Sequence, residues 1–234
     1  AFRVVRFAPG RAKASEFVEA WNDASRALVI GPFAGNAIDW EALATEPRVV
    51  AIIHKATIGT TRLDPKYLER RAQARRRGYL WGSYHWGVAG DGRKQADFYL
   101  DTSKPTDDEV IALDLEDVSD PKLMSIEGAV QFIEQVKLRT GRTPLIYANR
   151  KTVVLIARSS SVAAFSGTRL WYAWFKPELG RFPPGPWKTY TLWQFSSEIR
   201  VQYRVPGTEA DMDVNVFNGS IEEMKANWPF RDHR

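Results

Sequence analysis

The chain has 234 residues, of which 44% are hydrophobic and 12% aromatic, and this composition is typical of one large folded domain. Its 33 Lys and Arg residues exceed its 28 Asp and Glu residues, so the formal net charge of +5 favours an anionic partner. No apolar run of about 18 residues occurs, which argues against a membrane-spanning helix. The lack of cysteine excludes disulfides and thiolate sites, and 3 histidines argue against a multi-histidine metal centre. Neither a basic tail nor a lysine-rich tract is present, so we expect no nucleic acid partner.

Strand-like apolar runs alternate with helix-like segments over the first two thirds of the chain. The expected strands are residues 27–33, 48–57, 79–86, 109–116 and 143–149, and the expected helices are residues 39–46, 65–78, 93–103 and 125–141. Several of these helices open on Asp or Ser and close near Gly, as capped helices do. This alternation predicts βαβ units and a parallel sheet.

After about residue 160 the pattern changes to strands separated by loops rich in Pro and Gly. The expected strands are residues 169–175, 189–195 and 211–217. Eight strands are enough to close a barrel. We therefore predict the α/β class and a single TIM-like β/α barrel over residues 27–220, with five β/α units followed by three strands that lack full helices. Residues 1–26, with a helical stretch at 14–25, are expected to form an N-terminal extension, and residues 221–234 a C-terminal tail.

The stretch VIALDLED, residues 110–117, runs from a buried strand directly into acidic residues. Alternate side chains of a strand face the same side, so Asp114 and Glu116 are expected to share one wall. The carboxyl ends of strands carry the chemistry of β/α barrels. The alternative is that Asp117 caps the next segment and that the other two acids are solvated.

The other strand ends would supply further side chains to the same barrel mouth. The candidates are Lys55, Thr57, Tyr84, His85, Trp86, Tyr147, Trp171, Trp174, Trp193, Gln194 and Asp213. Aromatic rings stack on sugars, and most glycosidases use a pair of carboxyl groups to break the glycosidic bond. Three of these residues also have structural interpretations: His85 as a hydrogen-bonded buried histidine, Trp193 as a core residue and Asp213 as a turn residue.

Nine short segments, in this order and spacing, resemble the family 25 glycoside hydrolases, the muramidase family that includes many phage and bacterial lysozymes. They are IDWEAL, IIHKATIG, GYLWGSYHW, QADFYL, ALDLED, TGRTPLIYAN, LWYAWF, LWQFS and MDVNVFNG. The resemblance implies a β/α barrel that cleaves the β-1,4 bond between N-acetylmuramic acid and N-acetylglucosamine in peptidoglycan. It implies that Glu116 is the general acid, Asp114 its partner carboxylate and Asp213 the acid near the C-terminus. It also places Tyr84 and Trp193 on positions that line the substrate cleft.

Two positions depart from the family pattern. Gly31 stands where the first strand of the family ends on an aspartate, and Ile58 replaces the glutamate of KATEG. Asp39 does not replace the missing aspartate, because it occupies an expected helix N-cap.

Three functions are therefore expected as alternatives. They are an active muramidase, a weakened or inactive relative that binds cell-wall glycan, and a hydrolase of a different polysaccharide whose pocket is reshaped at Gly31 and Ile58. No metal or organic cofactor is needed for any of them. We expect a monomer that is secreted, periplasmic or facing the cell wall, with a signal peptide that is not visible and has been removed.

Overall fold

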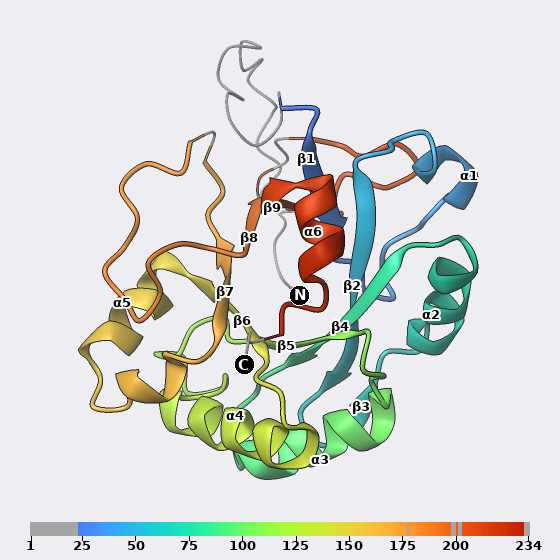
Figure 1. Cartoon of the computed structure of the whole chain (residues 1–234). Helices are drawn as coiled ribbons and strands as arrows, with labels where there is room; N and C mark the ends of the chain where they lie inside the picture. The colour runs from blue at the N-terminus through green and yellow to red at the C-terminus, as the bar shows by residue number, and fades with distance from the viewer. Residues whose placement is uncertain (1–22, 177, 198–199, 201–202, 232–234) are drawn as a thin grey trace.

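Eight strands close into a barrel in the computed structural model, which describes residues 23–176, 178–197, 200 and 203–231 (Figure 1). The barrel strands are β1 (Arg26–Ile30), β2 (Val49–Ile58), β4 (Leu80–Trp86), β5 (Val110–Asp114), β6 (Leu145–Asn149), β7 (Arg169–Ala173), β8 (Leu192–Ser196) and β9 (Val214–Ser220). Pairing of β1 with β2 closes the ring. A short strand, β3 (Arg62–Leu63), pairs antiparallel with the end of β2 outside the ring. The predicted barrel is confirmed.

Helices follow each of the first five barrel strands. They are α1 (Trp40–Leu43), α2 (Tyr67–Arg76), α3 (Gly92–Ser103), α4 (Ile126–Thr140) and α5 (Arg150–Arg158). Asp39, Asp91 and Ser125 cap α1, α3 and α4, as the sequence predicts for helices that open on Asp or Ser. The sequence did not predict α5, because its run of β-branched and apolar residues also suits a strand. In the described residues, β7 and β8 are followed by loops and a short 3-10 helix (Val162–Phe165) precedes β7.

Strand β9 runs antiparallel to both of its neighbours, β8 and β1. The sequence indicated a parallel sheet, and the first seven strands of the ring have that arrangement. Parallel neighbours require a crossover connection, usually a helix. The described part of the connection between β8 and β9 contains no helix, so the chain re-enters the barrel from the mouth and β9 points the other way.

Alternate side chains of the strands build two separate hydrophobic clusters. One fills the barrel interior and includes Val29, Tyr84 and Trp171, while the other lies between the strands and the helices. The segment predicted as a C-terminal tail contains helix α6 (Ile221–Asn227), which contacts β9 and β1 and buries Met224 fully in the interior cluster. Of the predicted N-terminal extension, residues 1–22 lie outside the described residues, and Arg26 already belongs to β1.

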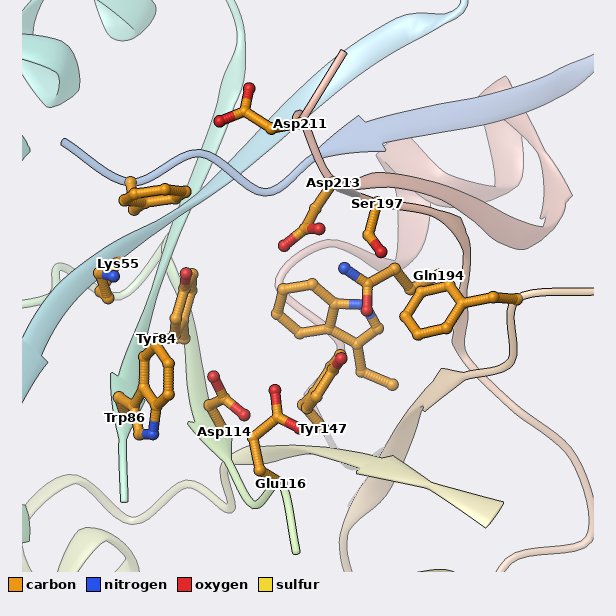
Figure 2. A pocket seen from close by; sticks show the side chains of 13 residues that line it. Lys55, Tyr84, Trp86, Asp114, Glu116, Tyr147, Gln194, Ser197, Asp211 and Asp213 are labelled. Carbon is orange, nitrogen blue, oxygen red and sulfur yellow. The ribbon is translucent and has the colours of Figure 1, made fainter. Parts of the chain in front are cut away.

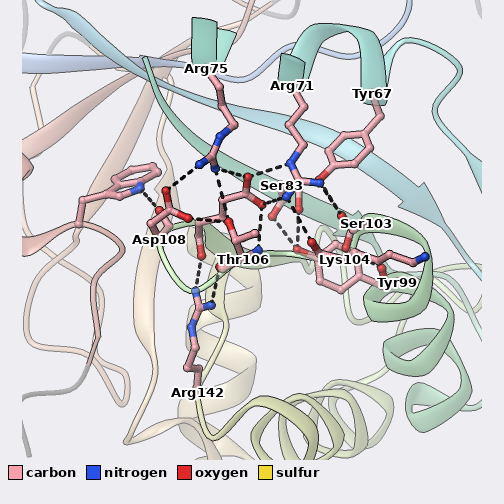
Figure 3. Close-up of polar contacts among 12 residues, drawn as sticks. Tyr67, Arg71, Arg75, Ser83, Tyr99, Ser103, Lys104, Thr106, Asp108 and Arg142 are labelled. Carbon is pink, nitrogen blue, oxygen red and sulfur yellow. Dashed lines mark hydrogen bonds and ion pairs between the residues drawn. The ribbon is translucent and has the colours of Figure 1, made fainter. Parts of the chain in front are cut away.

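A buried carboxylate ties α2 to the turn that precedes β5 (Figure 3). Glu109 is 1% exposed and forms ion pairs with Arg71 at 2.8 Å and Arg75 at 2.7 Å. The backbone N–H of Thr106 donates to the second carboxylate oxygen at 3.2 Å. Charge-assisted hydrogen bonds of this kind are the strong ones, so this network helps to fix the position of β5.

Glu109→Gln is expected to lower the free energy of unfolding by about 1 to 3 kcal/mol, because Arg71 loses its anionic partner and Arg75 loses the buried one of its two. Urea denaturation measures this change. Asp108→Asn is the matched control, since Asp108 also pairs with Arg75 but is 65% exposed. Its loss should cost at most about 1 kcal/mol. Equal losses in the two variants would contradict the role assigned to Glu109.

Candidate active site

A pocket of about 330 Å³ lies at the barrel mouth (Figure 2). Its lining residues are Phe33, Lys55, Tyr84, Trp86, Asp114, Glu116, Tyr147, Trp171, Phe175, Gln194, Ser197, Asp211 and Asp213. Most of them stand at the carboxyl ends of parallel strands, and the last two precede the reversed strand β9. The size of the pocket and its mixture of aromatic and acidic side chains are typical of a small-molecule or glycan site.

The backbone around Asp114 and Glu116 is fixed by hydrogen bonds from the neighbouring β/α unit. The N–H of Leu115 donates to the carbonyl of Tyr147 at 3.0 Å. The carbonyl of Glu116 accepts from the side-chain amide of Asn149 at 2.9 Å and from the hydroxyl of Thr152 at 2.7 Å. Because Asn149 also caps α5, the start of that helix and the position of Glu116 are coupled.

Both carboxyl groups resist ionisation in this environment. Burial raises the pKa of Asp114 well above its usual range, and the nearby carboxylates of Glu116 and Asp213 raise it further, while Lys55 opposes them. Burial also raises the pKa of Glu116, with a smaller contribution from Asp117. Figure 2 shows the two carboxyl groups side by side. Two acids that repel each other's charge hold a proton at pH values where isolated acids have lost it.

Asp117 itself points away from this pair. Its carboxylate accepts from Ser119 and forms an ion pair with Lys151 at 2.8 Å, and these contacts lower its pKa to about 2. Asp117 therefore has a structural role, as the alternative interpretation of this stretch predicted. Asp114 and Glu116, in contrast, face the pocket.

Lys55 is 8% exposed, and its ammonium group lies 4.3 Å from the ring centroid of Phe33 and 5.1 Å from that of Trp86. Burial lowers its pKa, and the carboxylates of Asp64, Asp114 and Asp213 oppose that shift. Contacts with two aromatic faces stabilise a partly desolvated cation. Lys55 therefore adds positive charge to one side of a mainly acidic pocket.

Trp171 forms an aromatic floor with two tyrosines. Its ring lies edge-to-face with Tyr84 at 6.0 Å and with Tyr147 at 5.3 Å between centroids. Its indole N–H donates to Asn215 at 2.6 Å, and Asn215 in turn donates to the carbonyl of Val29. Burial raises the pKa of both tyrosines well above the usual value, so their hydroxyls stay neutral. The interior of the barrel thus holds this floor in one orientation.

Gly31 lies directly against Asp213 at the mouth. Its N–H donates to the Asp213 carbonyl at 2.9 Å, and a Cβ added at Gly31 would lie 3.2 Å from the Asp213 Cβ and 3.6 Å from the Trp171 ring. The backbone of Gly31 is outside the left-handed region. At the other altered position, Ile58 pairs with Trp86 across β2 and β4. Asp39 caps α1 through bonds to two backbone N–H groups, as predicted.

Three of the predicted substrate-contacting residues do not line the pocket, and for His85 and Trp193 the prediction is wrong. His85 and Trp193 are 0% exposed, and Trp174 donates from its indole to the carbonyl of Glu178 at 3.0 Å. Strand alternation explains all three. Tyr84, Trp86 and Gln194 point inward, so His85 and Trp193, which lie beside them, point outward to the helices. Trp174 lies three residues after the inward-facing Trp171 and therefore also points outward.

His85 is a structural residue with both ring nitrogens in hydrogen bonds. One nitrogen bonds to the hydroxyl of Thr57 at 2.7 Å, the other to the amide oxygen of Gln95 at 3.1 Å, and the ring stacks on Phe132 at 5.2 Å. Thr57, also expected at the mouth, is 0% exposed because the register of β2 against β4 shifts between Lys55 and Thr57, which turns Thr57 to the face of His85. The structural interpretation of His85 is the one that holds.

The buried histidine has a consequence for acid stability. Burial lowers the pKa of His85 from 6.5 to about 4, so the unfolded chain binds more protons between these values. Stability contributed by neutral His85 is therefore present above pH 6.5 and lost as the pH falls towards 4. The wild type loses unfolding free energy as the pH falls over this interval. We expect this loss to be smaller by about 2 to 4 kcal/mol in His85→Gln. Urea denaturation at several pH values tests this, and an unchanged pH slope would contradict it.

The pocket also contains residues that the sequence analysis missed. They are Phe33, Phe175, Ser197 and Asp211. The period of two would have found Phe175, which follows Trp171 and Ala173 on the inward face, and Asp211, two residues before Asp213. Phe33 and Ser197 come from the loops after β1 and β8, and no sequence pattern predicts the course of those loops.

Two kinds of feature are absent from the part of the chain that the structure describes. No group of three His, Cys, Asp or Glu side chains there is arranged to hold a metal ion. Nor does any helix there combine the length and apolar character needed to cross a membrane.

Comparison with known proteins agrees with the fold. The model of glycosyl hydrolases family 25 matches residues 34–203. The uncharacterized protein YegX of Escherichia coli O6:H1 is 27% identical over 195 residues, which cover 80% of this chain and 68% of YegX. The bacterial lysozyme from Streptomyces coelicolor superposes with a TM-score of 0.73 at 24% identity, over 87% of this chain and 97% of that one.

The same fold occurs in the muramidase from Trichobolus zukalii, with a TM-score of 0.70 at 24% identity, over 86% of this chain and 97% of that one. A family GH25 lysozyme from Aspergillus fumigatus has a TM-score of 0.69 at 24% identity, over 86% and 98% of the two chains. These likenesses show a shared barrel. Since the family match spans well over half of the chain, the protein belongs to glycosyl hydrolases family 25.

Proposed function

We propose that this protein is a peptidoglycan hydrolase that cleaves the β-1,4 bond between N-acetylmuramic acid and N-acetylglucosamine. The observation that carries the proposal is the pair of carboxyl groups with raised pKa, Asp114 and Glu116, in an aromatic pocket at the barrel mouth. Membership of family 25 supports it, as do fold neighbours that are a lysozyme and a muramidase. The substrate places the site of action at the cell wall.

Glu116 would act as the general acid. It would transfer its proton to the glycosidic oxygen as the bond to the sugar breaks, and its raised pKa favours the protonated form that can do so. Asp114, once ionised, has two possible roles. It would either stabilise the positive charge that develops on the sugar ring or orient the substrate's acetamido group as an internal nucleophile. Asp213 supplies further negative charge near Asp114.

Analysis of the new reducing end tests the proposal. The protein is incubated with purified peptidoglycan, and the released fragments are reduced and identified by mass spectrometry. N-Acetylmuramic acid at the reducing end is the expected result. N-Acetylglucosamine there would contradict the proposed bond, and retention of the protein on intact peptidoglycan without any release would favour a glycan-binding relative.

The second candidate, a weakened or altered hydrolase, is favoured by one observation: a glycine next to Asp213 where the family carries an acid. If this gap limits the rate, Gly31→Asp should raise peptidoglycan hydrolysis, because it restores a carboxylate at the mouth. The variant should also melt at a lower temperature, since its Cβ would lie 3.2 Å from that of Asp213 and the new charge faces existing acids.

Gly31→Asn is the matched control, because it adds the same volume without charge. A gain in rate with Asp but not with Asn would support a weakened muramidase. A loss of rate in both variants would mean that the pocket is built around the glycine, and a different polysaccharide would become the better substrate hypothesis.

A further inference from the structure

The pocket is locally acidic although the whole chain is basic. Its described lining contains four carboxyl groups, Asp114, Glu116, Asp211 and Asp213, and Lys55 as the basic side chain. Even with one proton shared by Asp114 and Glu116, negative charge exceeds positive charge there. The net charge of the chain is +5, so its long-range field repels cations. Any preference for a cation must therefore come from the pocket itself.

A second and independent observation concerns hydrogen bonding. Seven buried side-chain nitrogen and oxygen atoms among the described residues have no partner. Three of them are pure acceptors, one oxygen each of Asp114, Gln194 and Asp211, and all three residues line this pocket. The other four atoms belong to Asn36, Trp81, Arg169 and Tyr172, which do not line it.

Gln194 shows that the acceptors without a donor are not confined to acidic side chains. Its side chain is uncharged and only 2% exposed, yet its oxygen lacks a donor. A buried acceptor without a donor costs free energy, and a ligand that supplies the donor recovers it. Figure 2 shows Gln194, Asp213 and Asp211 on the part of the wall opposite Asp114 and Glu116. We name Gln194, Asp211 and Asp213 the acceptor wall.

We infer that the acceptor wall binds a free 2-amino group of the glycan, so that the preferred substrate contains de-N-acetylated amino sugar. This inference rests on the proposed function, because it takes the ligand to be a cell-wall type glycan. A protonated amine offers three donors and a positive charge, whereas an acetamide offers one donor and no charge. An amine bound at the acceptor wall therefore supplies donors and the positive charge that the excess of carboxylate calls for, whereas an acetamide there supplies one donor and no charge.

The test compares the binding of two tetrasaccharides that differ at the 2-position. Chitotetraose, which is fully N-acetylated, and the glucosamine tetrasaccharide, which has free amines, are titrated calorimetrically into the Glu116→Gln protein at near-physiological salt. The catalytic variant prevents cleavage during the measurement. We expect the amine form to bind at least about 10-fold more tightly, as a charge-assisted hydrogen bond would provide.

Asp211→Asn in the same background identifies the group responsible. It keeps the shape and removes the charge, so the ratio of the two affinities should fall at least about 5-fold. A variant that merely disturbed the fold would weaken both ligands and leave the ratio unchanged. Asp107→Asn is the control, because Asp107 is 93% exposed and outside the pocket. Its ratio should equal that of the parent.

Two results would overturn the inference: equal or tighter binding of chitotetraose, or an affinity ratio that Asp211→Asn leaves unchanged. Hydrolysis separates this inference from the proposed function. Native and chemically de-N-acetylated peptidoglycan are digested with the wild type. Preference for the amine in binding with no cleavage of either polymer would remove the proposed function alone, and cleavage with no preference for the amine would remove the inference alone.

Discussion

Replacing Glu116 with Gln is expected to lower the turnover of peptidoglycan by about 100-fold or more while binding is retained. The substitution keeps the shape of the side chain and its hydrogen-bonding capacity but removes the proton that the leaving oxygen requires. Release of soluble fragments from labelled cell wall measures the rate, and a pull-down with insoluble wall measures binding.

Glu134→Gln is the matched control for this experiment. Glu134 lies on α4, is 57% exposed, pairs with Arg93 and does not line the pocket. Its replacement should leave the rate unchanged. If Glu116→Gln retained wild-type turnover, Glu116 would lose the role of general acid, and the search would move to the other carboxyl groups of the pocket.

Asp114→Asn is expected to lower activity and to raise stability. We expect a loss of turnover on the order of 100-fold, because the charge that faces the reacting sugar is gone. The free energy of unfolding at pH 7 should rise by about 1 kcal/mol or more, since a buried carboxyl group with a raised pKa is costly once ionised.

The sign of this stability effect follows from the pKa. The folded-state pKa of Asp114 lies above the unfolded value, so the wild type is penalised as the pH rises past the unfolded value. The advantage of Asp114→Asn should therefore be present at pH 7 and small at pH 3. Urea denaturation at both pH values tests it, and a variant less stable than the wild type at pH 7 would show that the Asp114 carboxylate holds the fold together.

The carboxyl pair and the barrel were predictable because both depend on local periodicity. Asp114 and Glu116 continue the inward face of β5, and the expected strands and helices agree with the structure except for α5, α6, β3 and the 3-10 helix before β7. The predictions for His85 and Trp193 were wrong because they conflict with the same periodicity. Two consecutive residues of a strand cannot both face the barrel interior, so Tyr84 excludes His85 and Gln194 excludes Trp193.

Other parts of the site depend on contacts between distant segments. Asn149 is the last residue of β6, and the pairing of β6 with β5, which continues to Leu115, brings its amide to the carbonyl of Glu116. Phe33 reaches the pocket because Lys55 and Arg70 contact the loop after β1, with Arg70 donating to the Phe33 carbonyl at 2.7 Å. Such loop positions are set by tertiary contacts, which no single-sequence pattern reports.

The reversal of β9 determines where the ends of the barrel lie. Because β9 runs against β1, Ile30 pairs with Val214 at the mouth, and Arg26 pairs with Ser220 at the far end. The polypeptide thus enters and leaves the barrel at the pole remote from the pocket. Neither the start of β1 nor the end of β9 therefore obstructs the mouth, which stays open to a long, cross-linked polymer that cannot be threaded through a narrow entrance.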